Sequence, residues 1–225
     1  MTTEFLASEG GQVSYEDSHS QGPLVVLDLR GHGQSSTGFA DYSIAGHGRD
    51  ALALVKQLDA GPAFLVGNSF AGGVAVWASV EEPELVKGIV LIGSFVRKPK
   101  VNPIMALVMK LMLSGPWGAS AWMSCYPKMY PHRKPDDFAE HVAETKRMMK
   151  EPGRFAALQR IANAPKDDSE SRLASVRAPA LVIMGDADPD FPDAAGEATF
   201  QAEALNASKV LVTPQRMKQD RDRRN

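Results

Sequence analysis

Short apolar runs alternate with longer amphipathic stretches along most of this chain. The short runs are rich in Val, Ile and Leu and contain almost no charge, which is typical of strands buried on both faces of a parallel sheet. In the longer stretches the apolar positions follow a helical period. The predicted strands span residues 24–29, 63–66, 88–93, 180–185 and 210–212, and the predicted helices span residues 44–58, 72–82 and 194–205. This order predicts an α/β fold in which helices cover both faces of a mostly parallel sheet.

Two segments depart from this alternation. Near the start of the chain, Phe5-Leu6 and Val13–Tyr15 flank Gly10-Gly11, a pattern that predicts a two-stranded hairpin. Residues 97–165 are rich in Met, Pro and aromatic side chains, which predicts a helical insertion over the sheet. The expected divisions are a core domain in two parts (residues 1–96 and 166–214), the insertion (residues 97–165) and a disordered polar tail (residues 215–225).

The composition fits one globular domain that acts on small molecules. The chain has 225 residues, a hydrophobic content of 44% and a formal net charge of -2. That charge lacks the strong basic field with which proteins bind nucleic acids or anionic membranes. No metal-ligand cluster, phosphate-binding loop or nucleotide fingerprint occurs in the sequence, so we expect no metal and no cofactor. We expect a small-molecule substrate or ligand as the partner, and the sequence leaves the oligomeric state open.

The sequence predicts a cytoplasmic location. Cys125 is the only cysteine, so no disulfide can form within the chain. The first residues lack the basic start and apolar centre of a signal peptide. The most apolar stretch, residues 104–113, is interrupted by Lys110 and is shorter than the roughly 20 residues that cross a bilayer. We therefore expect no membrane span.

The clearest chemical signal is the run Gly67-Asn68-Ser69-Phe70-Ala71, between a predicted strand and a predicted helix. A nucleophile on such a turn has a strained backbone, so the residues two before and two after it must be small. Gly67 and Ala71 meet this requirement. The backbone N–H of Phe70 would face a developing oxyanion at the helix N-terminus. The motif predicts Ser69 as a nucleophile; the alternative is an ordinary small-residue turn.

Four segments together resemble the α/β-hydrolase superfamily, in particular its esterase, lactonase and haloalkane dehalogenase branch. They are residues 28–35 (Asp-Leu-Arg-Gly-His-Gly-Gln-Ser), 67–71, 89–93 and 181–188. The resemblance implies an α/β-hydrolase fold and serine-dependent hydrolysis of small esters or lactones. It also implies that the insertion is a cap whose apolar side suits an apolar substrate. Ordinary packing of helices against the core explains the same composition.

By this resemblance the acid of the catalytic triad is Asp188, in Gly185-Asp186-Ala187-Asp188 just after a predicted strand. The order of Ser before Asp is the one expected for this fold. A carboxylate there would orient an imidazole and stabilise its protonated form. The alternative is a polar loop in which one Asp caps the following helix.

The histidine base of the triad has no counterpart in this sequence. The resemblance places it after the last strand, but no histidine follows His141. A serine hydroxyl without a general base is a poor nucleophile at neutral pH. His32 is the substitute that could approach the carboxyl edge of the sheet, although its position between two glycines is typical of a structural loop. The other histidines are His19 in the polar N-terminal segment, His47 at the start of an exposed helix, and His132 and His141 in the insertion.

A strand and its crossover helix are also absent from the expected pattern. Residues 22–27 have the pattern of the superfamily's third strand, yet they run directly into Asp28. Residues 28–35 resemble the loop that follows the superfamily's fourth strand. Two parallel strands need a connection of about a dozen residues, so one strand and its crossover helix are absent, and with them the loop that supplies the second oxyanion donor. An alternative alignment makes His32-Gly33 the oxyanion loop and the fourth strand the missing one.

Three hypotheses follow. In the first, the chain is a serine hydrolase of small esters or lactones. In the second, it is a non-catalytic relative that binds a small apolar ligand or a protein through the insertion and the altered sheet edge. In the third, it is a truncated product without a stable fold.

Overall fold

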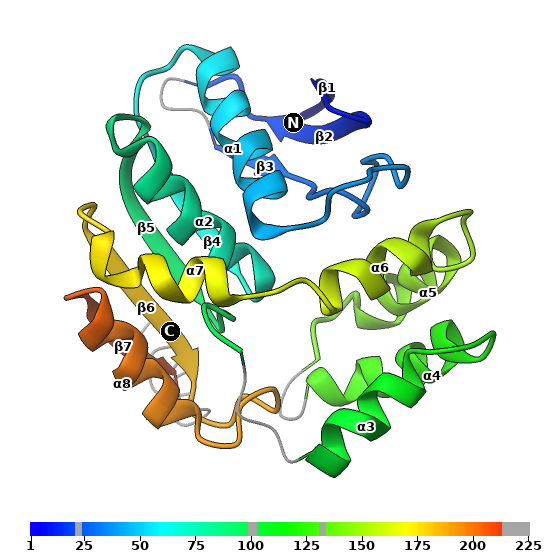
Figure 1. Ribbon diagram of the computed structural model, residues 1–225. Helices are drawn as coiled ribbons and strands as arrows, with labels where there is room; N and C mark the ends of the chain where they lie inside the picture. Colours follow the sequence, from blue (N-terminus) through cyan, green and yellow to red (C-terminus); the bar gives the residue numbers. More distant parts are fainter. Residues whose placement is uncertain (21–23, 99–102, 131–133, 213–225) are drawn as a thin grey trace, which may run out of the picture.

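The computed structural model describes residues 1–20, 24–98, 103–130 and 134–212 (Figure 1). The predicted tail at residues 215–225 lies outside these residues. No helix in the described part of the chain is long and apolar enough to cross a membrane.

The N-terminal part of the chain forms a small antiparallel sheet. Its strands are β1 (Thr2–Ser8), β2 (Gly11–Asp17) and β3 (Val25–Leu27), in the order β1-β2-β3. Gly10 has a φ of 89° between the first two strands, a conformation that favours glycine in the turn. The predicted hairpin is therefore confirmed. The third strand is shorter than the predicted residues 24–29, because Asp28 already belongs to the loop that follows.

A second sheet holds the remaining strands, all of them parallel. They are β4 (Ala63–Asn68), β5 (Val86–Ile92), β6 (Ala180–Gly185) and β7 (Ser208–Val212), in the order β4-β5-β6-β7. The associated helices are α1 (Ile44–Leu58), α2 (Phe70–Glu81), α7 (Asp167–Arg172) and α8 (Ala194–Ala204), with short 3-10 helices at Pro83–Leu85 and Leu173–Ser175. The strands and helices predicted from periodicity in this region are confirmed.

The helices gather on one side of the second sheet (Figure 1). The buried strand residues Ile89, Leu91, Val182 and Met184 pack there with apolar residues of α2 and α8. On the opposite face Phe64 and Val66 are each 64% exposed and Val210 is 41% exposed. The structure differs here from the prediction that helices cover both faces. Right-handed crossovers that always advance in the same direction leave their helices on one face, and β4-β5-β6-β7 advances in one direction only.

The two sheets are not hydrogen-bonded to each other, because β3 pairs with β2 and not with β4. Helix α1 joins them: Leu54 packs with Val13 and Tyr15 of the first sheet. Phe70 at the start of α2 packs against the cores of both sheets. A single layer of helices thus holds two separate sheets side by side.

Between β5 and α7 the elements that the structure describes are all helices. It contains α3 (Pro103–Met112), α4 (Gly118–Cys125), a 3-10 helix (Tyr126–Met129), α5 (Phe138–Met148) and α6 (Arg154–Ala162). Helix α6 is attached to the core, since Arg154 donates to the Ser35 carbonyl at 3.1 Å and Arg160 to the Phe39 carbonyl at 2.8 Å. These helices fall within the predicted insertion, and its limits at residues 97 and 165 stay a prediction.

Candidate active site

Ser69 lies on the sharp turn between β4 and α2, in a backbone conformation that few residues other than glycine adopt. Its φ is 54° and its ψ is -120°. Such a conformation costs on the order of 1–3 kcal/mol and persists only where the surroundings enforce it. A side chain at Gly67 would collide with the backbone of Ala71, so the turn needs a glycine two residues before the serine. Both features are those of a nucleophile elbow.

The surroundings of the turn enforce this conformation through hydrogen bonds to the segment after β5. The Ser69 N–H donates to the Ile92 carbonyl at 3.0 Å, and the Phe95 N–H donates to the Ser69 carbonyl at 3.0 Å. The Asn68 amide also donates to the Ile92 carbonyl, at 3.2 Å. The fully buried Ser94 hydroxyl donates to the Gly67 carbonyl at 3.0 Å. The carboxyl ends of β4 and β5 thus position Ser69 as one unit.

Phe70 is the first residue of α2, and its N–H is among those at a helix N-terminus that have no acceptor four residues earlier. That N–H follows Ser69 directly, where an oxyanion donor is expected. The Phe70 ring contacts two titratable side chains, of which Lys166 was not considered in the sequence analysis. The His47 imidazole lies edge to face at 5.1 Å between ring centroids, and the Lys166 ammonium lies 5.7 Å from the ring centroid.

Asp188 lies at the same edge of the sheet, just beyond the end of β6. A Cβ added to Gly93 would lie 3.0 Å from its carboxylate oxygen Oδ2, and Gly93 directly follows the Ile92 carbonyl that holds Ser69. Asp188 is partly buried, and the Asp190 N–H donates to it at 3.0 Å. Asp193, and not Asp188, caps helix α8 by accepting from the Gly196 N–H at 2.8 Å. The helix-capping alternative therefore applies to Asp193.

No histidine completes the constellation in the described residues, where the Ser69 hydroxyl and the Asp188 carboxylate have no imidazole partner. His32 contacts the Arg30 carbonyl through Nδ1 at 3.2 Å, a local contact within its own loop. The structure thus places Ser69, Phe70 and Asp188 together at one edge, and gives His32 a loop contact in place of a contact with Ser69.

His47 was expected on an exposed helix, and the structure corrects this. The side chain is fully buried, with Nδ1 2.8 Å from the Ser43 carbonyl, and Nε2 has no hydrogen-bond partner among the described residues. Burial lowers the pKa of His47, which keeps the imidazole neutral near pH 7. The sequence signal for this burial was the spacing of three residues between His47 and Ile44, the first buried position of the same helix.

Lys166 lies before α7, where its ammonium donates to the Ala164 carbonyl at 2.9 Å and the Ala162 carbonyl at 3.2 Å. Burial lowers the pKa of Lys166. No hydrogen bond joins Lys166 or His47 to Ser69 in the described residues. The two side chains shape the surroundings of Phe70, and neither is positioned as a base.

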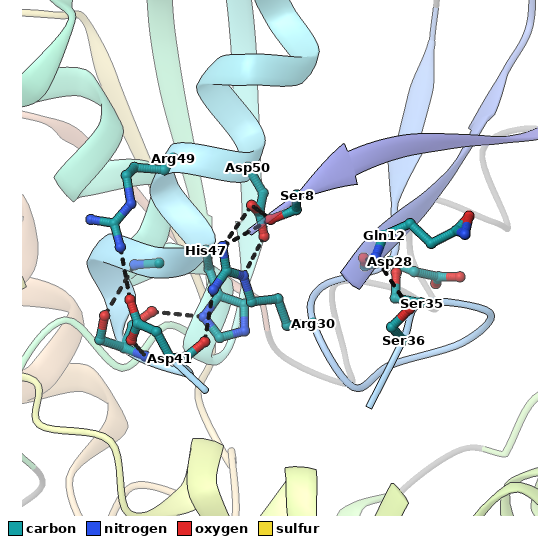
Figure 2. Close-up of polar contacts among 12 residues, drawn as sticks. Ser8, Gln12, Asp28, Arg30, Ser35, Ser36, Asp41, His47, Arg49 and Asp50 are labelled. Atoms are coloured by element: carbon teal, nitrogen blue, oxygen red, sulfur yellow. Dashed lines mark hydrogen bonds and ion pairs between the residues drawn. The ribbon is translucent and has the colours of Figure 1, made fainter. Parts of the chain in front are cut away.

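Arg30 and Asp28 of the Asp28–Ser35 loop make polar contacts with the N-terminal sheet and with α1 (Figure 2). Arg30 reaches Asp50 on α1 with two hydrogen bonds of 2.6 and 2.8 Å, and both side chains are almost fully buried. Asp28 accepts from the Ser14 hydroxyl at 2.6 Å and from the Gln34 N–H at 3.0 Å. This loop therefore connects the N-terminal sheet to α1.

No group of three or more His, Cys, Asp or Glu side chains in the described ranges is arranged to hold a metal ion.

Comparison with known proteins gives matches over most of the chain. A family model described as the alpha/beta hydrolase family matches residues 10–215. The 3-oxoadipate enol-lactonase 1 of Acinetobacter baylyi is 25% identical over 195 residues, which are 85% of this chain and 71% of that enzyme. An uncharacterised protein of Mycobacterium tuberculosis is 37% identical over 71 residues, 32% of this chain; the match spans about a fifth (21%) of that protein's length.

Among solved structures, that of Est816, described as an N-acyl homoserine lactone degrading enzyme, superposes with a TM-score of 0.74. The superposition covers 93% of this chain and 92% of that chain at 19% sequence identity. At this identity the likeness shows a shared fold.

Proposed function

The chain belongs to the alpha/beta hydrolase family and has its fold, and from this membership we propose that Ser69 is the nucleophile of a site for small carboxylic esters or lactones. The observation that carries the proposal is the Ser69 backbone, with a φ of 54° between a parallel strand and a helix N-terminus. The fold does not require a serine at this position, because glycine would adopt the same backbone conformation with less strain.

In the proposed reaction, the Ser69 oxygen attacks the carbonyl carbon of the ester. The electron pair of the carbonyl bond moves to its oxygen, where the Phe70 N–H and the N-terminus of α2 stabilise the negative charge. When this intermediate collapses, the alcohol leaves with a proton and Ser69 is acylated. Water then releases the acid. Asp188 supplies negative charge beside the site, where it would stabilise a cationic base.

This mechanism requires an acceptor for the proton of the Ser69 hydroxyl. No described side chain accepts it, since neither His32 nor His47 contacts the hydroxyl. Loss of the histidine from a catalytic triad lowers kcat by about 10⁶-fold, while oxyanion binding leaves some catalysis. We therefore expect acylation to be slow in this chain. Asp28 directly follows the end of β3. This leaves no room between them for the segment that carries the second oxyanion donor in the family.

The substrate class rests on the relatives and on the insertion. The names of two similar proteins refer to lactones, an enol-lactone in one case and N-acyl homoserine lactones in the other. We assign the helical segment of residues 97–165 the role of a cap over the site, and its Met and Trp residues favour an apolar substrate. Arg154 and Arg160 would anchor such a cap to the core through the carbonyls that they bind.

A fluorophosphonate probe tests the nucleophile directly, because it phosphonylates activated serines. Intact-protein mass spectrometry should show one adduct, mapped to Ser69 and absent from Ser69→Ala. Ser124→Ala is the matched control, since Ser124 is an exposed serine that donates only to a helix carbonyl. Labelling that survives in Ser69→Ala, or no labelling of folded protein, would refute the assignment.

A second candidate is a non-catalytic relative that binds a small apolar ligand or a protein partner. It is favoured by the absence of an imidazole at Ser69 and Asp188 in the described residues. Hydrolysis of p-nitrophenyl acetate with and without added imidazole separates the two functions. A hydrolase that lacks only its base should gain a rate that disappears in Ser69→Ala, whereas a binding protein shows the same imidazole background in both proteins.

A further inference from the structure

Helix α3 presents an apolar stripe to solvent. Its members recur at helical spacing and are more than half exposed: Ile104 (73%), Leu107 (56%), Val108 (51%) and Leu111 (55%). In a helix that packs on a core, a stripe at this spacing is the buried side. Contiguous exposed apolar surface of this kind marks a site that contacts something else.

Trp117 extends the stripe beyond the end of the helix. Its side chain is 57% exposed, and its indole N–H donates to the Leu111 carbonyl at 3.2 Å, which holds the ring against the last turn of α3. Tryptophan at the edge of an apolar helix is typical of surfaces that enter the lipid headgroup region, where the ring is apolar and its N–H is polar.

The chain segment that contains the stripe carries charge of one sign. The chain as a whole carries 25 basic and 27 acidic residues, yet residues 85–135 contain no Asp or Glu. Basic side chains that the structure describes as exposed in this stretch are Lys87, Lys98, Lys110, Lys128 and Lys134. Lys110 is on α3 itself. The overall charge of -2 therefore conceals a segment without acidic residues that includes the apolar helix.

We propose that α3 and Trp117 dock on the surface of an anionic lipid bilayer. The occupant must be apolar where it meets Leu107 and Leu111 and negatively charged where it meets Lys110 on the same helix. An anionic bilayer offers both within one headgroup layer. Helix α4 contacts α3 through Cys125, whose Sγ lies 3.6 Å from Met112 Sδ. This docking does not depend on the chemistry of Ser69.

Co-sedimentation with vesicles tests the proposal. The full chain should bind phosphatidylcholine vesicles that contain phosphatidylserine, bind pure phosphatidylcholine vesicles weakly, and lose binding as salt is added. The double variant Leu107→Asp/Leu111→Asp should reduce the affinity more than about tenfold, because the stripe then loses its two central apolar side chains. Lys110→Gln should weaken binding to the anionic vesicles about fivefold.

Phe64→Asp is the matched control, because Phe64 is an equally exposed apolar residue on the uncovered face of the sheet. It should bind vesicles as the unchanged chain does, with circular dichroism showing that all variants are folded. Equal binding to neutral vesicles, or an equal loss of binding in Phe64→Asp, would overturn the proposal, as would binding that survives the double substitution.

Discussion

At the scale of single residues, Ser69 shows how a site can hold a conformation that its side chain opposes. The turn keeps a φ of 54° because the neighbouring backbone is hydrogen-bonded to Ile92 and Phe95 on both sides of the serine. A residue held against its preference stores free energy that a suitable substitution releases. The strain can therefore be measured apart from any activity.

We predict that Ser69→Gly unfolds at a higher urea concentration than Ser69→Ala. Glycine adopts positive φ without steric cost, so the free energy of unfolding should rise by about 1–3 kcal/mol relative to alanine. Both variants lack the hydroxyl, so the comparison isolates the backbone. Equal stability of the two variants would show that the turn is not strained.

His47 gives the protein a pH dependence whose sign follows from its burial. Burial lowers the pKa of His47 in the folded state below the usual value of about 6.5, so the unfolded chain binds the proton first as the pH falls. The free energy of unfolding should therefore be highest above about pH 6.5 and fall below it, by at most about 1.4 kcal/mol per pH unit. Urea unfolding at several pH values measures this slope.

The control for this pH dependence is His47→Phe, which keeps a ring in the same buried position. Its unfolding free energy should fall less steeply between pH 7 and pH 5 than that of the unchanged chain. A slope that is the same in both proteins would assign the effect to other groups, such as His32, whose pKa burial also lowers.

At the scale of elements, the Asp28–Ser35 loop is the connection on which the packing of the N-terminal sheet depends. Arg30 in this loop binds Asp50 on α1, and the Ser8 hydroxyl of β1 donates to the same carboxylate at 2.6 Å (Figure 2). Three segments distant in the sequence therefore meet at one ion pair. A buried charge left without its partner is costly, so this contact is a sensitive point of the fold.

We predict that Asp50→Asn lowers the free energy of unfolding by about 3–5 kcal/mol, because it leaves the Arg30 guanidinium buried without a counter-charge. The pair has side-chain exposures of only 3% and 4%. Glu82→Gln is the matched control, since it breaks an ion pair with Lys56 that solvent reaches, and it should change stability little. A similar decrease in the free energy of unfolding in both variants would show that the buried pair of Arg30 and Asp50 contributes no more than an exposed ion pair.

At the scale of the whole molecule, the described helices cover the second sheet on one face only. Parallel sheets in proteins are almost always covered on both faces, because their strands are apolar on both sides. Here the uncovered face carries Phe64, Val66 and Val210, and no described strand pairs with β4 on the side away from β5. The molecule therefore exposes apolar surface that a complete α/β layer arrangement would bury.

We expect this face to bind the dye 1-anilinonaphthalene-8-sulfonate in the folded state. The double variant Phe64→Thr/Val66→Thr should lower the dye fluorescence while leaving the thermal midpoint within a few degrees, since both side chains are already 64% exposed and threonine suits strands. A large fall in the midpoint would mean that another segment of the chain covers these residues.

Thermal unfolding followed by circular dichroism tests the hypothesis of a chain without a stable fold. The cores on either side of α1 share Phe70, so we expect them to unfold together in one cooperative transition. A broad decline in signal without a midpoint would support the truncated, unfolded product.

The sequence by itself determined the features that depend on neighbouring residues. Periodicity predicted the strands and helices of the core, and the small residues around Ser69 predicted the strand-to-helix turn, because both patterns follow from local backbone geometry. Only the tertiary structure decided which strands pair, which face of the sheet stays open, and that His47 is buried while the stripe of α3 is exposed. These depend on contacts between residues far apart in the chain, and an apolar period indicates only that one side of a helix is apolar, not what lies against it.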